Sequence, residues 1–419
     1  MNMEAEQQYL KLLQTLETSP APLEPSDEET QLDKILAIAD WNMGLFLGMK
    51  VTEEDKAALG PALRRYLDYC LVGLTSKIKR QCSAINVKGL LSDRISKKAD
   101  LIAFRYQGNN GVRLMRAFQA DPLWDCAEVK QLYQARMLDQ FKEPGGMLMV
   151  DTIGFVKRGL HTAGVERRYC ESLGKTDSCQ IGVFIGYAGE KGYGILDASL
   201  SLPQSWFGEE NESRRFKSDI PDEVVYRTNP QLAFDMVDNA RKVRPLSFKW
   251  VGCDATMGAD LSFRESLPES THFFSDIHSS QHFRTANQEL KTAAELSEDN
   301  SIRWEKVLFA RGYLKPVPAE AKRCRVTEED QTEELWLYML RLSKDEIRYA
   351  ISNAPEKTTM SELQWAACLR WQILKCYDEC KEHLGLNDYA SRSYVTWHRH
   401  MLHVMMASYF ITESRMALK

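Results

Sequence analysis

The spacing of apolar residues predicts a helical region in the first third of the chain. From about residue 32 to residue 141, apolar side chains recur every three or four positions, as on one face of a helix. One helix is predicted over residues 58–78, where the apolar residues with this spacing are Leu63, Leu67, Cys70 and Leu74. A proline-rich, acidic stretch at 19–29 is typical of a loop.

The pattern becomes one of strands after the sequence EPGG at residues 143–146. The elements predicted from here on are strands at 147–157, 180–187 and 193–202, a helix at 229–243, strands at 246–252, 336–342 and 347–352, and helices at 359–385 and 394–417. Three antiparallel strands followed by a helix and a further strand match the ribonuclease H-like core, an α/β fold with a mixed sheet. Because many unrelated proteins share one fold, this match does not by itself establish a function.

The order of these elements predicts four parts of the chain. They are a helical N-terminal domain over 1–142, the first part of an RNase H-like core over 143–260, an inserted β-containing region over 261–357, and a C-terminal helical part of the core over 358–419.

Composition and charge are those of an ordinary globular protein. The 419 residues are 44% hydrophobic and carry a net charge of −5, which excludes a histone-like polycation. No apolar run approaches the roughly 20 residues that span a bilayer, and the N-terminus is unlike a signal peptide, so we expect a cytoplasmic protein without a membrane partner. The ten cysteines form no CxxC pair and indicate free thiols rather than a zinc site.

One segment is locally basic. Residues 77–98 carry seven lysines and arginines against the single acidic residue Asp93. The first three of them are Lys77, Lys79 and Arg80. Such a run forms either a solvated helix face or a segment that contacts phosphate groups of a nucleic acid.

Two aspartates are the first candidates for chemistry. Asp151 follows an apolar run on the first predicted strand, and Asp254 ends the strand FKWVGCD. A carboxylate in such a strand is costly unless it is paired or binds a metal ion. In an RNase H-like fold these two positions lie side by side, where carboxylates bind Mg²⁺ for displacement at phosphate. Alternatively, Asp151 is satisfied by the backbone or Lys157, and Asp254 caps the turn that follows it.

Five segments resemble the DDE transposases of bacterial insertion sequences, in order and with similar spacing. They are VDTIGFVKRGLHTAGVERRYCESLGKTDSCQIGVFIGYA (150–188), LSLPQSWF (200–207), FKWVGCDATMGAD (248–260), YAISNAPEKTTMSELQWAACLRW (349–371) and CKEHLGLNDYASRSYVTWHRHM (380–401). The stretches YCLVGLTSKIKR and PLWDCAEVKQL resemble the helical domain of that family more loosely.

The resemblance implies an RNase H-like core with three acidic ligands for Mg²⁺ or Mn²⁺. It implies cleavage of DNA at the ends of a mobile element and joining of the freed 3′ hydroxyl to target DNA. The first two family acids match Asp151 and Asp254, and the arginine and lysine of the family's helix signature match Arg370 and Lys381. The third acid, a glutamate in that family, is replaced by Leu374.

Asp378 is the candidate for a substitute third ligand. It lies one helical turn beyond Leu374 and on the same face as Arg370, whereas Glu379 points away by more than a quarter turn. The alternative is that both acids are surface carboxylates paired with Lys375 or Lys381.

Basic residues near these positions are candidates for contacts with DNA phosphates. The candidates are Lys157, Arg158, His161, Arg167 and Arg168 after the first strand, together with Arg370, Lys381 and Arg392. For the group after the first strand, the alternative is a solvated hairpin.

We therefore expect an insertion-sequence transposase in the bacterial cytoplasm, associated with the nucleoid. Its partners would be double-stranded DNA, both as the terminal repeats of the element and as target DNA, and a second copy of the chain. Two alternatives are a catalytically inactive derivative that only binds DNA and a host nuclease with the same fold.

Overall fold

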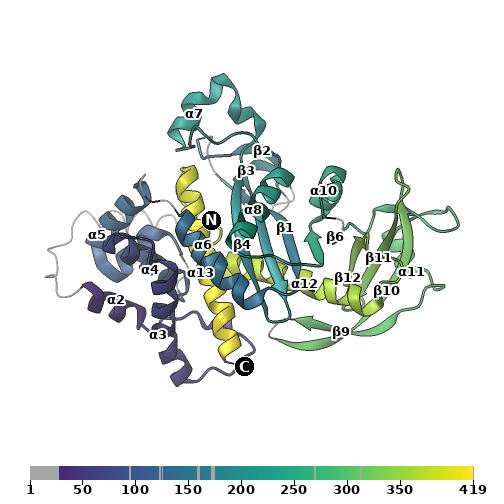
Figure 1. Ribbon diagram of the computed structural model, residues 1–419, viewed down its shortest axis with the longest axis horizontal. Coiled ribbons are helices and arrows are strands. Elements are labelled where there is room, and N and C mark those ends of the chain that lie inside the picture. The colour runs from purple at the N-terminus through teal and green to yellow at the C-terminus, as the bar shows by residue number, and fades with distance from the viewer. Residues whose placement is uncertain are drawn as a thin grey trace. The chain divides into compact units, whose positions relative to one another are not determined.

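A computed structural model describes residues 28–93, 96–121, 124, 126–157, 161–170, 175–268, 270–311 and 314–418 (Figure 1). The chain divides into two compact units. The first comprises Met1–Val129 with His383–Ala390, and the second comprises Lys130–Glu382 with Ser391–Lys419.

The first unit is helical, as its apolar spacing predicts. Its helices are α2 (Glu28–Leu36), the short 3-10 helix η1 (Met43–Phe46), α3 (Glu53–Cys70), α4 (Lys77–Leu90) and α5 (Ala99–Ala120), and α6 (Ala127–Phe141) begins at its end. Gly108 interrupts α5 with a φ of 63°, a backbone conformation that favours glycine.

The prediction of one helix over residues 58–78 is wrong. The chain leaves the helix after Cys70, and Ser76 caps the start of α4 by accepting a hydrogen bond from the backbone N–H of Lys79. Gly73 lies in the break, where a Cβ atom would come within 2.1–2.4 Å of the Glu128 carboxyl group. Leu74 is buried although it lies outside a helix, so the apolar spacing continues across the break and conceals it.

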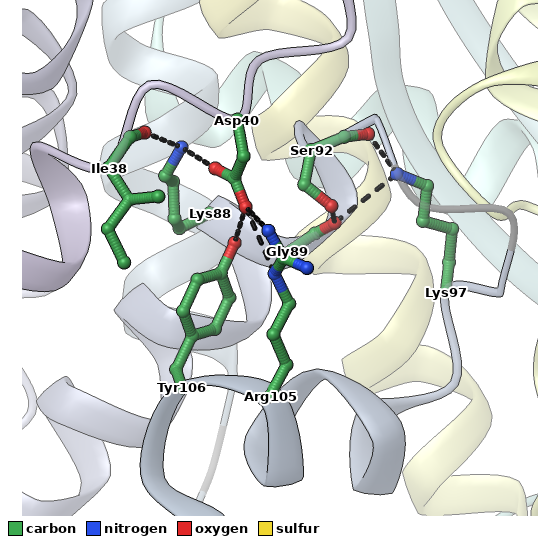
Figure 2. A network of polar contacts seen from close by, with 8 residues as sticks. All are labelled: Ile38, Asp40, Lys88, Gly89, Ser92, Lys97, Arg105 and Tyr106. Atoms are coloured by element: carbon green, nitrogen blue, oxygen red, sulfur yellow. Dashed lines mark hydrogen bonds and ion pairs between the residues drawn. The ribbon is translucent and has the colours of Figure 1, made fainter.

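A polar network crosses the interior of the first unit (Figure 2). The carboxylate of Asp40 accepts hydrogen bonds from Lys88 Nζ at 2.6 Å, Arg105 Nη2 at 2.5 Å and the Tyr106 hydroxyl at 2.9 Å. The Lys88 ammonium also donates to the carbonyl of Ile38 and lies 3.4 Å from the centre of the Trp41 ring. This network ties α4 and α5 to the segment that follows α2.

The basic run at 77–98 is partly interior. Lys88 and Lys97 are buried, and Lys97 Nζ donates to the backbone carbonyls of Gly89 and Ser92. Lys79 forms an ion pair with Asp121 at 2.7 Å. Close to half of the run therefore stabilises the helical unit and is not available to bind phosphate.

The second unit is built on a mixed sheet. Its first strands are β1 (Met147–Val156), β2 (Glu166–Cys170), β3 (Lys175–Gly189), β4 (Gly192–Ser201), β5 (Trp250–Cys253) and β6 (His272–Asp276). The core order is β4-β3-β1-β5-β6, in which β3 is antiparallel to β1 and β4, and β5 is parallel to β1 and β6. Helix α8 (Asn229–Val243) connects β4 to β5, and its bounds match the prediction. This arrangement confirms the predicted RNase H-like α/β core.

The sheet continues from β6 into the inserted region. The further elements are β7 (His282–Arg284), β8 (Leu290–Thr292), α11 (Ala293–Glu298), β9 (Glu305–Arg311), β10 (Leu314–Glu328), β11 (Glu334–Arg341) and β12 (Ile347–Ser352). Strand β12 pairs with β6, and β9 to β12 lie to the right of β1 in Figure 1. They enclose a small apolar core of their own that includes Phe283, Leu296 and Leu337.

Two long helices complete the second unit. Helix α12 (Met360–Glu382) begins at a capping box formed by Thr359 and Glu362, and α13 (Tyr394–Ala417) has the predicted bounds. Both approach β3 closely, because a Cβ at Gly186 would come within 3.1 Å of Ile373 and one at Gly182 within 2.9 Å of Trp397. The remaining short elements are η3 (Gln204–Phe207), η4 (Glu209–Asn211), α7 (Glu212–Lys217), α9 (Ala255–Gly258) and α10 (Leu261–Glu265).

Candidate active site

Three aspartates come into register on neighbouring parallel strands. Asp151 lies on β1, Asp254 follows β5, and Asp276 ends β6. Each aspartate directly follows a paired residue of the sheet, because Val150 pairs with Cys253 and Cys253 pairs with Ser275. Equivalent positions of parallel strands lie at one edge, so the three carboxylates are placed where β5 and β6 end.

Arg370 of α12 bridges two of these carboxylates. Its Nη1 lies 2.6 Å from Oδ2 of Asp151, and its Nη2 and Nε lie 2.8 Å and 2.9 Å from Oδ2 of Asp276. The side chains of Arg370 and Asp151 are only 4% and 6% exposed, whereas that of Asp276 is 39% exposed. One planar guanidinium thus neutralises a buried carboxylate and a half-exposed one.

Burial and the ion pairs shift the pKa values of this group. Burial raises the pKa of Asp151, and the charge of Arg370 partly offsets that shift. Burial alone would lower the pKa of Arg370, but the two facing carboxylates raise it well above its ordinary value. Arg370 therefore carries a permanent positive charge at this site.

Asp254 is held by the backbone and by Thr152. Its Oδ1 accepts the N–H of Met257 at 2.7 Å, which caps α9, and its Oδ2 accepts both the N–H and the hydroxyl of Thr152, at 3.1 Å and 2.9 Å. The capping role that we considered as the alternative is present. It also fixes the orientation of the carboxylate beside β1.

Leu374, the position that the resemblance assigns to the third acid, faces a cavity. Leu374 is half-buried and lines a cavity of about 550 Å³ together with Arg370, Asp276 and the exposed Asp378. Asp378 is thus on the same cavity as Arg370, as the helical spacing predicts, but Arg370 pairs with Asp151 and Asp276 instead. Glu379 is buried and forms an ion pair with Arg415. Its Oε2 lies 2.9 Å from Nη1 of Arg415, and its Oε1 lies 3.0 Å from Nη2.

The sequence analysis missed Asp276. Its signal was present, since it ends the short apolar strand HFFSD in the same way that Asp254 follows β5. We placed residues 261–357 in an insertion and therefore did not consider a core strand there. The parallel pairing of β6 with β5 is what brings Asp276 to the site.

The oxygen donors present fit a divalent ion in part. Among the residues that the structure describes, no group of three or more His, Cys, Asp and Glu side chains could hold a metal ion. Mg²⁺, however, is commonly bound by one or two carboxylates, with water and substrate phosphates as the other ligands. Asp151 and Asp254, hard oxygen donors on adjacent strands, fit such an ion when DNA supplies phosphate oxygens.

The predicted DNA contacts are distributed over both units. In the second unit, Arg167 on β2 and Arg392 are exposed, Arg168 lies 3.9 Å from Glu166, and Lys157 directly follows β1. Lys381 is exposed in the last turn of α12, and His161 is exposed. In the first unit, Lys77 is exposed and Arg80 donates to the backbone carbonyl of Leu74. Arg158 lies outside the described residues.

The family model described as DDE superfamily endonuclease matches residues 71–343, which is more than half of the chain. The chain therefore belongs to the DDE superfamily endonucleases, in agreement with the resemblance that its motifs carry. The matched range includes Asp151, Asp254 and Asp276 and ends before α12. Members of this family act on DNA, and the superfamily generally uses divalent ions such as Mg²⁺ or Mn²⁺.

No curated protein matches the chain. Of the helices in the described ranges, none is sufficiently long and apolar to cross a membrane.

Proposed function

We propose that this protein is an insertion-sequence transposase that binds the ends of a mobile element, cleaves the DNA there and joins the freed 3′ hydroxyl to target DNA. The observation that carries the proposal is the placement of Asp151 and Asp254 on adjacent parallel strands of an RNase H-like sheet. Membership in the DDE superfamily endonucleases supports it.

Asp151 and Asp254 would hold a divalent ion, which supplies Lewis acidity at the scissile phosphate when it is bound. Thr152 orients Asp254 by two hydrogen bonds and so limits the positions of its oxygens. The burial of Asp151 keeps bulk water from that side of the site.

Exposed cations around the same sheet would bind the DNA backbone. The main candidates in the second unit are the exposed Arg167 and Arg392 and the exposed Lys381 on α12, with the half-buried Lys157 beside them. The first unit would add sequence-dependent contacts as a helical DNA-binding domain, with Lys77 exposed at the start of α4. Two element ends must be held at once, which favours a homodimer on DNA.

A second candidate function is a transposase derivative that binds DNA without cleaving it. Two observations favour this non-cleaving derivative. Leu374 has no oxygen that could bind a metal ion, and Arg370 already pairs with one oxygen of Asp151. A host nuclease on the same fold would instead cut DNA without preference for element ends and without joining.

The test is cleavage of a DNA fragment that carries the sequences flanking the gene on both sides, with Mg²⁺ or Mn²⁺. We compare the native chain with Asp151→Asn, Asp254→Asn and Asp378→Asn, and with Asp238→Asn, an exposed aspartate of α8, as the matched control. A transposase cleaves at the ends and loses this activity in Asp151→Asn and Asp254→Asn but not in Asp238→Asn.

The other outcomes identify the alternatives. End-specific binding without cleavage in either metal would establish the non-cleaving derivative. Cleavage of unrelated DNA at the same rate, without joined products, would establish a nuclease. Loss of cleavage in Asp378→Asn would assign the missing ligand to Asp378, one helical turn beyond Leu374.

A further inference from the structure

The ion pairs of Arg370 suggest how this site is controlled. We propose that Arg370, anchored by Asp276, competes with the divalent ion for Asp151, so that the free protein holds its site closed. This inference rests on the proposed function only in placing the ion at Asp151 and Asp254. It adds a positioning role for Arg370, which matches the arginine of the family signature, and one for Asp276, which lies outside that signature.

The geometry of the closed arrangement is specific. A guanidinium is planar, and its donors have fixed directions, so it reaches two carboxylates only when both are correctly placed. Here one edge of Arg370 faces Asp151 at 2.6 Å and another faces Asp276 at 2.8 Å and 2.9 Å. Asp276 therefore fixes the side chain in the orientation that covers Asp151.

An ion and the Arg370 guanidinium compete for the charge of Asp151. Oδ2 of Asp151 already accepts a short, charge-assisted hydrogen bond from Arg370, which an ion at this carboxylate would weaken. Two cations sharing one carboxylate in a site that is only a few per cent exposed also repel each other with little screening. Binding of the ion at Asp151 thus favours movement of Arg370 away from this carboxylate.

The structure provides space for that movement. Arg370 and Asp276 both line the cavity of about 550 Å³ beside α12. Its wall includes the rings of Phe309 and Trp371, whose centres are 5.8 Å apart. Aromatic faces accept guanidinium groups favourably, so the released side chain would be stabilised there.

The test is binding of Mn²⁺ to the full chain without DNA, measured by electron paramagnetic resonance of the unbound ion. We expect Arg370→Gln to bind Mn²⁺ at least about tenfold more tightly than the native chain, because no cation then competes for Asp151. We expect a smaller gain in Arg370→Lys, which keeps the charge but lacks the planar group that bridges Asp151 and Asp276. Adding Asp151→Asn removes this gain. Asp276→Asn also tightens binding, because Arg370 loses its anchor.

Matched controls separate competition from a general effect of charge. Lys375→Gln removes one positive charge from a residue of α12 that lines the same cavity. We expect it to leave Mn²⁺ affinity within about twofold, since Lys375 is not an ion-pair partner of Asp151 or Asp276 among the described contacts. Circular dichroism of each variant verifies folding, and Arg370→Lys keeps the buried charge if Arg370→Gln does not fold.

Four results would overturn the proposal. Equal Mn²⁺ affinity in the native chain and both Arg370 variants rules out competition, and end cleavage by the native chain would then leave the proposed function intact. An equal gain in Lys375→Gln means that charge alone acts. Weaker binding in Asp276→Asn makes Asp276 an ion ligand rather than an anchor. If no variant binds Mn²⁺, the ion site itself is absent and cleavage fails with it.

Discussion

The polar network around Asp40 allows a sharp prediction about stability. Asp40→Asn keeps the shape of the side chain but removes the charge that faces Lys88 and Arg105. The Lys88 side chain is fully buried and that of Asp40 is 9% exposed, so Lys88 cannot exchange its lost partner for water. We expect the helical unit to lose much of its stability.

The magnitude follows from the burial of each group. Removing one member of a buried ion pair costs about 3–5 kcal/mol, because the other charge remains without compensation. Arg105 is 26% exposed and recovers part of its loss by contacting water, and the asparagine still accepts a hydrogen bond from Tyr106. These two effects reduce but do not cancel the cost, so we expect a loss of about 3 kcal/mol or more.

The assay is hydrogen exchange of the amides in α4 and α5, which reports opening of this unit separately from the rest of the chain. Asp33→Asn is the control, because Asp33 is 59% exposed and its partner Arg64 also pairs with Asp68. We expect the control to change the opening free energy by less than about 1 kcal/mol. A change of that size in Asp40→Asn as well would refute the reasoning.

The same network predicts a dependence on pH. Burial raises the pKa of Asp40. Its bonds to Lys88, Arg105 and Tyr106 together lower the pKa by more than burial raises it, so the net pKa lies below its ordinary value of 3.8. The stability contributed by Asp40 is therefore complete above pH 3.8 and is lost as the pH falls through the lower, folded-state pKa. Asp40→Asn lacks this acid-dependent loss, which hydrogen exchange at several pH values would measure.

Three further predictions concern other buried or functional groups. Leu374→Glu restores a carboxylate one turn after Arg370, and we expect at least about a tenfold rise in Mn²⁺-dependent cleavage; an unchanged rate would mean that the helix is not oriented toward the ion. Burial lowers the pKa of Lys97 from 10.5 to about 8. Between pH 8 and pH 10.5 the unfolded chain therefore binds more protons than the folded chain, and the free energy of unfolding rises with pH by roughly 3 kcal/mol. Lys97→Met should show no such rise in urea unfolding, and a flat native profile would contradict the prediction. Glu379→Gln leaves Arg415 buried without its charged partner, and we expect a loss of about 3–5 kcal/mol in urea unfolding, whereas a loss below about 1 kcal/mol would show that this pair contributes little.

Local patterns were sufficient for several of the long elements. The bounds of α8, α13 and β12 agree with the predictions. Helix α8 is amphipathic and begins at the capping box of Thr228 and Gln231, and α13, which is apolar on nearly all sides, begins after the cap Ser393. The break after Cys70 was not predictable in this way. Leu74 remains buried there, so the spacing of apolar residues is the same as in a continuous helix.

Two residues of the candidate site could be found from the chain alone. Asp151 lies on an apolar strand and Asp254 directly follows one. A carboxylate at such a position is costly unless it is paired or binds a metal ion. Asp276 has the same pattern, but it becomes a site residue only because β6 pairs in parallel with β5. Pairing between strands depends on packing over the whole sheet, which no local pattern encodes.

The sequence by itself determined the fold class, the two first carboxylates and the absence of a glutamate at Leu374. Tertiary structure alone decided which cation meets which carboxylate. Arg370 and Asp151 are 219 residues apart, and Lys88 and Asp40 are 48 apart, so their pairing depends on how helices and strands pack. A lysine or arginine in a sequence looks the same whether it binds solvent, DNA or a buried aspartate, because only burial and neighbouring charges distinguish these roles.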